Sequence, residues 1–89
     1  MKEFELTLQE QIISDIIFER VAQDTKWGDQ VDNTDRLWTV ILAEEFGEAA
    51  KEVLETGAMN GKLRYELIQC AAVCVAWIEA LDRRNDYGS

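Results

Sequence analysis

The longest stretch without a charged residue, Leu67 to Ile78, restricts the possible folds of this chain most strongly. It lies within a segment of helical periodicity that we expect to run from about Gly61 to Arg84. Apolar side chains occupy nearly every face of this predicted helix, and a helix of that kind takes a central place in its fold. The stretch has 12 residues, which is too few for a bilayer span of about 20 residues.

Two further helices are predicted before this one. The segment Thr7 to Glu10, TLQE, is typical of a capping box, and the isoleucines that follow recur at helical spacing. A second helix begins after Asn33 or Thr34, either of which can be its N-cap, and ends at Gly57. Residues 24–33, between the two helices, have the glycine, aspartate and asparagine content of a loop.

The connection after Gly57 is short, so the second and third helices are expected to be antiparallel neighbours, with Asn60 as a cap for the third. No linker or repeat divides the 89 residues, and we expect one all-α domain over residues 1–89. Two helices cannot cover the apolar third helix. We therefore predict that the chain forms a homodimer, or a homotetramer, and so completes a four-helix-type bundle.

The charge balance restricts the partners. The chain has 18 acidic and 9 basic residues and no histidine, a formal net charge of −9, which argues against binding DNA or RNA through the phosphates. A small anionic ligand can still bind if divalent cations lie between it and the carboxylates. The sequence opens without a signal-peptide pattern, so we expect a cytoplasmic protein that does not associate with a membrane.

Acidic residues gather on the second predicted helix, in the stretch LAEEFGEAAK at residues 42–51. Glu45 and Glu48 are three residues apart and so occupy neighbouring positions on the helix surface. Glu45 lies on the flank of the apolar arc, where a carboxylate without a positive partner is unfavourable. On the third helix, Glu66 and Gln69 flank the apolar seam in a similar way.

The polar flanks of two antiparallel helices can face each other, so these four side chains are expected to converge. Hard divalent cations such as Mg²⁺ prefer oxygen ligands, and Mg²⁺ shares its coordination with water and substrate phosphates. The pattern therefore predicts a magnesium site that is open to an anionic ligand. A simpler interpretation is a solvated helix face on which Lys51 pairs with Glu48, with Glu66 as an acid near a helix start.

At the same positions the chain resembles the MazG-like all-α nucleoside triphosphate pyrophosphohydrolases, whose motif is EExxE followed after a loop by ExxD. Residues 44–48, EEFGE, match the first half fully. The second half matches at Glu66 and departs at Gln69, where the family has Asp. The flanking segments KWGDQ, LWTVILAEEFGEAAKEV and ELIQCAAVCVAWIEALDR resemble small, phage-type members, so the likeness covers about residues 20–84.

The resemblance implies hydrolysis of a (deoxy)nucleoside triphosphate between its α- and β-phosphates, which gives the monophosphate and pyrophosphate. It implies Mg²⁺ as the cofactor, with Mn²⁺ as a substitute, and it places the metal ligands at Glu45, Glu48, Glu66 and Gln69. Glu44 is then a further ligand or the group that orients and deprotonates the attacking water. Because Gln69 carries no charge, we expect weaker cation binding than Asp would give.

Trp27 and Lys26 are the candidates for nucleotide binding. Family members bind the base between helices and often stack it on an aromatic ring, a role we assign to Trp27, with Lys26 contacting a phosphate. A tryptophan in a predicted loop can instead fold back onto the core. The alternative function is a MazG-like helical oligomer, weakly active or inactive, that binds a nucleotide or a protein, and the departure at Gln69 favours it.

Overall fold

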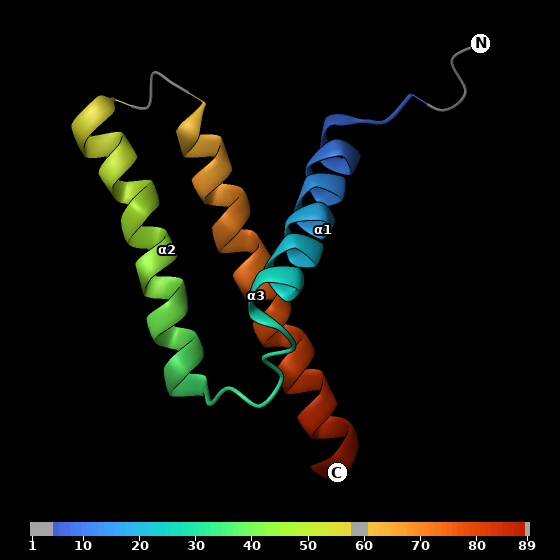
Figure 1. Ribbon diagram of the computed structural model, residues 1–89. Helices are drawn as coiled ribbons and strands as arrows, with labels where there is room; N and C mark the ends of the chain where they lie inside the picture. Colours follow the sequence, from blue (N-terminus) through green and yellow to red (C-terminus); the bar gives the residue numbers. More distant parts are fainter. Residues whose placement is uncertain (1–4, 58–60, 89) are drawn as a thin grey trace.

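The computed structural model describes residues 5–57 and 61–88, and within these ranges it contains three α-helices and no strand (Figure 1). This confirms the all-α class. None of the described helices combines the length and the apolar composition needed to cross a lipid bilayer. The predicted cap Asn60 lies outside the described residues. The helices are α1 at Leu8–Trp27, α2 at Asp35–Thr56 and α3 at Lys62–Gly88.

Local signals in the sequence set several helix ends. At the start of α1, the hydroxyl of Thr7 accepts from the Glu10 amide at 3.1 Å, and the Glu10 carboxylate accepts from the Thr7 amide at 2.9 Å. The predicted capping box is therefore confirmed. Thr34, rather than Asn33, caps α2 by accepting from a backbone amide of the first turn at 3.2 Å. Gly57 ends α2 in the left-handed conformation, with φ of 68°.

Two helices extend further than the sequence pattern indicated. α1 continues to Trp27 and ends where the Gly28 amide, at φ of 78°, donates to the Asp24 carbonyl at 2.8 Å. The prediction of a loop from Asp24 was therefore wrong for the last turn of α1. Polar residues remove the apolar periodicity there without interrupting the helical hydrogen bonds, which continue until glycine releases the chain. α3 likewise continues beyond Arg84 to Gly88.

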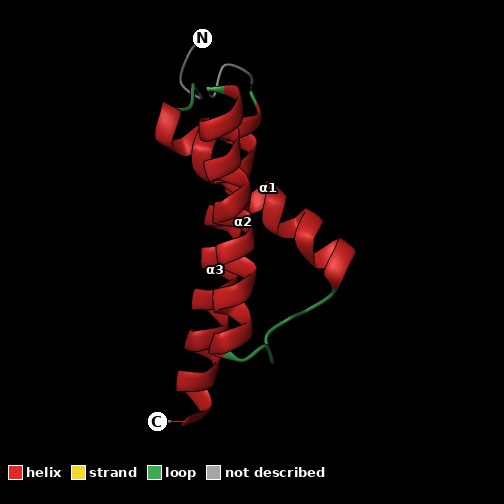
Figure 2. Ribbon diagram, turned by 90° about the vertical axis from the view of Figure 1, so that its left-hand side faces the viewer, coloured by secondary structure: helices red, strands yellow, loops and turns green. Residues whose placement is uncertain are grey.

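α1 and α2 both pack against α3. α2 and α3 lie side by side and run in opposite directions, and α1 lies across α3 at an angle (Figures 1 and 2). The predicted antiparallel pairing of the second and third helices is thus confirmed. The buried core joins α2 to α3 and consists of Trp38, Val73, Ala76 and Ala80, with Val31, Ile41, Leu42 and Trp77 packed against it.

α3 buries its small side chains in preference to its large ones. Ala72 is fully buried and Ala80 is 1% exposed, whereas Leu67 is 50% exposed and Ile78 is 55% exposed. The alanines allow α2 and α1 to approach closely. The seam of large apolar residues that the periodicity identified on α3 stays largely uncovered within one chain.

Candidate functional site

Six of the seven predicted site residues line one pocket of about 390 Å³, which we call the acidic pocket. The predicted residues in its wall are Lys26, Trp27, Glu45, Glu48, Glu66 and Gln69. The remaining wall consists of Glu19, Ala22, Gln23 and Tyr65. All three helices contribute, because α2 and α3 bring the two halves of the acidic pattern together and α1 closes the pocket from one side.

A second pocket, of about 250 Å³, shares part of this wall, and we call it the tryptophan pocket. Glu44, the seventh predicted site residue, lines it. Four residues line both pockets, namely Gln23, Trp27, Glu45 and Gln69. The other lining residues are Gln30, Trp38, Ile41 and Val73. A carboxylate-rich space therefore adjoins a space with aromatic and aliphatic walls.

Glu66 is the most buried acid of the site, with 8% of its surface exposed. It lines the acidic pocket, and its side chain makes no hydrogen bond or ion pair with any residue that the structure describes. An acidic residue that loses part of its hydration on folding without gaining a partner is unfavourable. A cation in the pocket would compensate that loss.

The pKa of Glu45 reports how the acids act on one another. Burial raises this pKa first, and the negative charges of Glu66, Glu48, Glu19 and Glu44 raise it further. Like charges make ionisation of a neighbouring carboxyl less favourable. Carboxylates from α1, α2 and α3 thus interact in a single cluster around Glu45.

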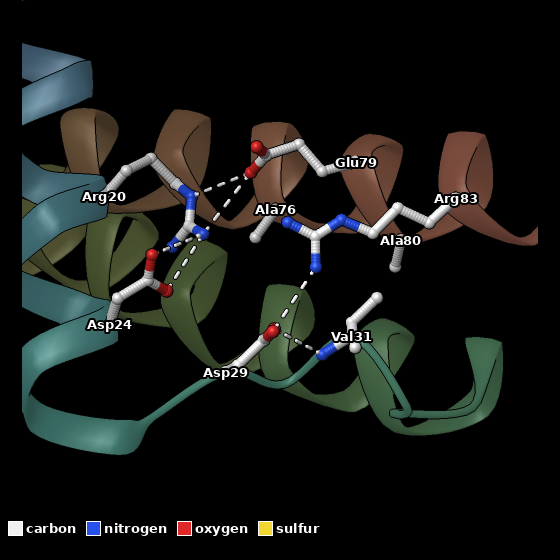
Figure 3. A pocket seen from close by; sticks show the side chains of 8 residues that line it. All are labelled: Arg20, Asp24, Asp29, Val31, Ala76, Glu79, Ala80 and Arg83. Carbon is white, nitrogen blue, oxygen red and sulfur yellow. Dashed lines mark hydrogen bonds and ion pairs between the residues drawn. The ribbon is translucent and has the colours of Figure 1, made fainter.

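Most arginine side chains of the described chain pair with acids outside this cluster. Figure 3 shows Arg20 of α1 held by Asp24 and Glu79, and Arg83 directed at Asp29, with N–O distances of 3.0 to 3.3 Å. Further ion pairs join Arg64 to Asp15, Arg84 to Asp35 and Lys62 to Glu52. These bases therefore do not neutralise the acidic pocket.

The described residues in the wall of the acidic pocket carry a formal charge of −3, from four glutamates and one lysine. That lysine, Lys26, places its Nζ atom 4.8 Å from the centroid of the Trp27 ring. Among the ion pairs of the described residues, none joins Lys51 to Glu48. The pairing required by the interpretation as a simple solvated face is therefore not formed.

Gln69 is held by a chain of hydrogen bonds from α1. Arg20 Nη1 donates to Gln23 Oε1 at 3.3 Å, and Gln23 Nε2 donates to Gln69 Oε1 at 3.4 Å. Arginine can only donate, so the order of donors and acceptors along this chain is fixed. The carbonyl oxygen predicted to bind the metal therefore already accepts a hydrogen bond from Gln23.

Carboxylate oxygens are the donors that Mg²⁺ and Mn²⁺ prefer, so the chemistry of the acidic pocket fits such a cation. In the described parts of the chain, no group of three acidic or cysteine side chains is close enough to hold an ion between them. Four ionised carboxylates repel one another, and glutamate side chains can change rotamer to meet around a cation. Binding would thus require side-chain movement.

Glu19 and Gln23 of α1 line the acidic pocket although neither was predicted to belong to the site. Their spacing carried a signal, because residues 19, 23 and 27 are four apart and share one face of a helix. The early end predicted for the first helix hid this relationship. Because α1 continues to Trp27, the exposed ring of Trp27 lies on the same helix face as Glu19.

The tryptophans differ in their surroundings. Trp27 is 61% exposed and so does not fold back onto the core, which leaves its ring accessible to a ligand. Trp38 is 3% exposed and belongs to the core, and its buried indole nitrogen has no hydrogen-bond partner among the residues that the structure describes. Trp77 is half-buried and donates to Asp35 Oδ1 at 2.9 Å.

Comparison of the chain with protein-family models, curated proteins and solved structures finds no match. The functional interpretation therefore depends on the acidic pattern, on its resemblance to the MazG-like motif and on the pocket that the three helices form.

Proposed function

We propose that this protein is a Mg²⁺-dependent pyrophosphohydrolase of (deoxy)nucleoside triphosphates that acts in the cytoplasm. The reaction cleaves the bond between the α- and β-phosphates and gives the monophosphate and pyrophosphate. The observation that carries this proposal is the acidic pocket, in which Glu45, Glu48 and Glu66 share a wall with the accessible ring of Trp27. The two halves of the MazG-like motif thus line a common space.

In this proposal, Glu45, Glu48 and Glu66 hold Mg²⁺, with Gln69 as the ligand that the family pattern adds. A bound Mg²⁺ neutralises phosphate charge and lowers the pKa of coordinated water. Glu44 acts as the base, because its carboxylate can take the proton of the attacking water. It lines the tryptophan pocket beside Glu45, at the border between the two spaces.

The nucleotide spans both pockets in this proposal. Its base stacks on Trp27, which lines the two pockets, and its phosphates extend into the acidic pocket with the cation. Lys26 contacts a phosphate oxygen with its ammonium group, which lies over the Trp27 ring in the free protein. The apolar wall of Ile41 and Val73 excludes water from one side of the base.

The test is incubation with a panel of canonical and modified (deoxy)nucleoside triphosphates and Mg²⁺, with products separated by ion-exchange chromatography. Monophosphate and pyrophosphate should appear in equal amounts with at least one substrate, and chelation of the metal should stop the reaction. The variant Glu48→Gln, purified in parallel, should be inactive and so exclude a contaminating hydrolase. Absence of monophosphate from every substrate would contradict the proposal.

We further propose that two chains associate, or four, to complete a four-helix-type bundle. α1 contains no buried residue, and its large apolar side chains are mostly exposed, Ile17 at 59%, Phe18 at 77% and Val21 at 61% among them. A wholly apolar hollow of about 410 Å³ lies between α2 and α3, lined by Phe46, Leu54 and Leu67 among others. Apolar surface of this extent is typical of an interface.

Light scattering coupled to size-exclusion chromatography tests the association. The expected mass is two or four times the 10.2 kDa of one chain. Phe18→Glu should shift the mass toward a single chain, because a buried charge at an interface is unfavourable. A wild-type protein of single-chain mass at high concentration would contradict this part of the proposal.

The second candidate function is a helical oligomer that binds a nucleotide or a protein without catalysis. It is favoured by Gln69, which brings no charge to the site and whose carbonyl already accepts from Gln23. Calorimetry with a nucleotide in the presence of Ca²⁺ separates binding from chemistry. Binding with Ca²⁺ but no product with Mg²⁺ would favour this function, and absence of any nucleotide binding would favour a protein partner.

A further inference from the structure

We infer that Glu19 of α1 supplies a fourth carboxylate to the cation site and takes the role that Gln69 holds by its position in the sequence. This inference rests on the proposed function, because it concerns the same site. It assigns to α1 a part in binding the metal, whereas the acidic pattern lies on α2 and α3 alone.

The position of Glu19 is the first support. Glu19 lines the acidic pocket together with Glu45, Glu48 and Glu66. Its side chain is half-buried, and within the described ranges it forms no hydrogen bond or ion pair. The adjacent Arg20 is engaged with Asp24 and Glu79 instead (Figure 3). Glu19 is therefore not neutralised by its neighbour.

The burial of the residue Glu66 is the second, independent support. Glu66 is 8% exposed and has no hydrogen-bond or ion-pair partner among the described residues, yet it lines the same pocket. A solvated cluster of surface acids would not require an acidic residue to lose nine-tenths of its exposure without a side-chain partner. A bound cation gives Glu66 the missing partner and draws the other acids inward.

The orientation of Gln69 is the third support. Its Oε1 atom accepts from Gln23, and the donor-only chemistry of Arg20 fixes that orientation. Gln69 therefore contributes a shared, neutral oxygen at best. The family pattern has a carboxylate at this position, and Glu19 restores the number of carboxylates facing the cation to four.

Binding of Mn²⁺ alone tests the inference on the full-length protein, without any nucleotide. Free Mn²⁺ is measured by electron paramagnetic resonance during titration of wild type, Glu19→Gln, Gln69→Met and Glu55→Gln. Glu55 is an exposed acid of α2 that lines neither pocket, so Glu55→Gln is the control for loss of one negative charge. Circular dichroism reports whether each variant keeps its helices.

The expected result is a rise in Kd for Mn²⁺ of at least about tenfold in Glu19→Gln, about threefold or less in Gln69→Met and none in Glu55→Gln. Glu19→Asp retains the carboxylate and should bind more tightly than Glu19→Gln. It also keeps the test decisive if Glu19→Gln loses helix content.

Three results would overturn the inference: wild-type affinity in Glu19→Gln, a loss in Gln69→Met as large as that in Glu19→Gln, or no Mn²⁺ binding by wild type. Failure of the proposed function looks different. Mn²⁺ binding that depends on Glu19, in a protein that hydrolyses no nucleoside triphosphate, supports the inference and rejects the enzyme. Hydrolysis of a triphosphate by a protein whose Mn²⁺ affinity does not depend on Glu19 rejects the inference alone.

Discussion

Glu66 of α3 and Glu45 of α2 lie close enough in the acidic pocket for the charge of Glu66 to raise the pKa of Glu45, an effect second only to burial. These residues belong to the two separate halves of the acidic pattern. Their interaction depends on the antiparallel pairing of α2 and α3. The chain thus keeps repelling carboxylates together, an arrangement that a divalent cation would stabilise.

The first prediction concerns the stability of the metal-free protein. The raised pKa means that the folded state binds the Glu45 proton more tightly than the unfolded chain does. The contribution of Glu45 to stability therefore falls as the pH rises from the ordinary Glu pKa of 4.5 through the raised pKa of Glu45 in the folded state. Glu45→Gln should increase the free energy of unfolding near pH 7 by roughly 0.5–1 kcal/mol while abolishing turnover.

Urea denaturation in the presence of a chelator, near pH 4 and near pH 7, measures this effect. The gain should be smaller at the lower pH, where Glu45 is largely protonated in both states. Glu55→Gln, on the same helix, removes one charge outside the cluster and should change stability little. A Glu45→Gln variant that is less stable than wild type near pH 7 would show that the acids do not repel.

The second prediction concerns nucleotide binding by Trp27. Its ring is 61% exposed, so Trp27→Ala should change the free energy of unfolding by less than about 0.5 kcal/mol. Loss of stacking on the base should weaken nucleotide binding by about 1–3 kcal/mol, and Trp27→Phe should retain part of the affinity. Calorimetry with Ca²⁺ and the preferred nucleotide measures both variants, and unchanged affinity in Trp27→Ala would place the base elsewhere.

The third prediction concerns Asp35 at the start of α2. The hydrogen bond from Arg84, followed by that from Trp77, lowers the pKa of Asp35 below its ordinary value of 3.8. An acid whose pKa is lower in the folded state stabilises the fold at pH values above its unfolded-state pKa. This stability is lost as the pH falls through its folded-state pKa. Asp35→Asn should therefore lower the Tm at neutral pH and leave it less sensitive to acid.

Scanning calorimetry over a pH series checks this expectation. Asp32→Asn is the matched control, because Asp32 lies in the preceding loop, is exposed and has no partner among the described residues. Equal Tm values for Asp35→Asn and Asp32→Asn at neutral pH would mean that the contacts between the start of α2 and α3 add nothing to stability.

The fourth prediction concerns two glycines, Gly47 inside α2 and Gly57 at the end of this helix. Gly57 has φ of 68°, so Gly57→Ala should destabilise the fold by about 1 kcal/mol, and Gly57→Asn by less. Gly47 lies inside α2, and a Cβ added there meets no heavy atom of the described residues within 4 Å. Gly47→Ala should therefore stabilise by about 0.5–1 kcal/mol. Chemical denaturation of Gly57→Ala and Gly47→Ala should show changes of opposite sign in the free energy of unfolding. Changes of the same sign would contradict this account of the α2 end.

Features set by local interactions could be predicted from the sequence. The capping box at Thr7, the left-handed end at Gly57 and the pairing of α2 with α3 all depend on residues close together in the chain. The placement of Glu45, Glu48 and Glu66 in one pocket also followed, because helical spacing and a short connection determine it.

The end of α1, and the features set by contacts between distant segments, could not be predicted. The end of α1 depends on where glycine first releases the backbone, and apolar periodicity carries no such signal. The role of Glu19 and the orientation of Gln69 depend on how α1 lies across α3, which the sequence pattern of α1 does not determine. Likewise, close packing decides that α3 buries alanines and leaves Leu67 half exposed.

The most direct test of the central claim is anomalous diffraction from crystals soaked with Mn²⁺ and a non-hydrolysable nucleoside triphosphate analogue. The account predicts an anomalous peak within coordination distance of Glu45, Glu48 and Glu66, with the analogue's phosphates beside it and its base on Trp27. No peak in the acidic pocket, with these carboxylates directed into solvent while the analogue is bound elsewhere, would contradict the claim.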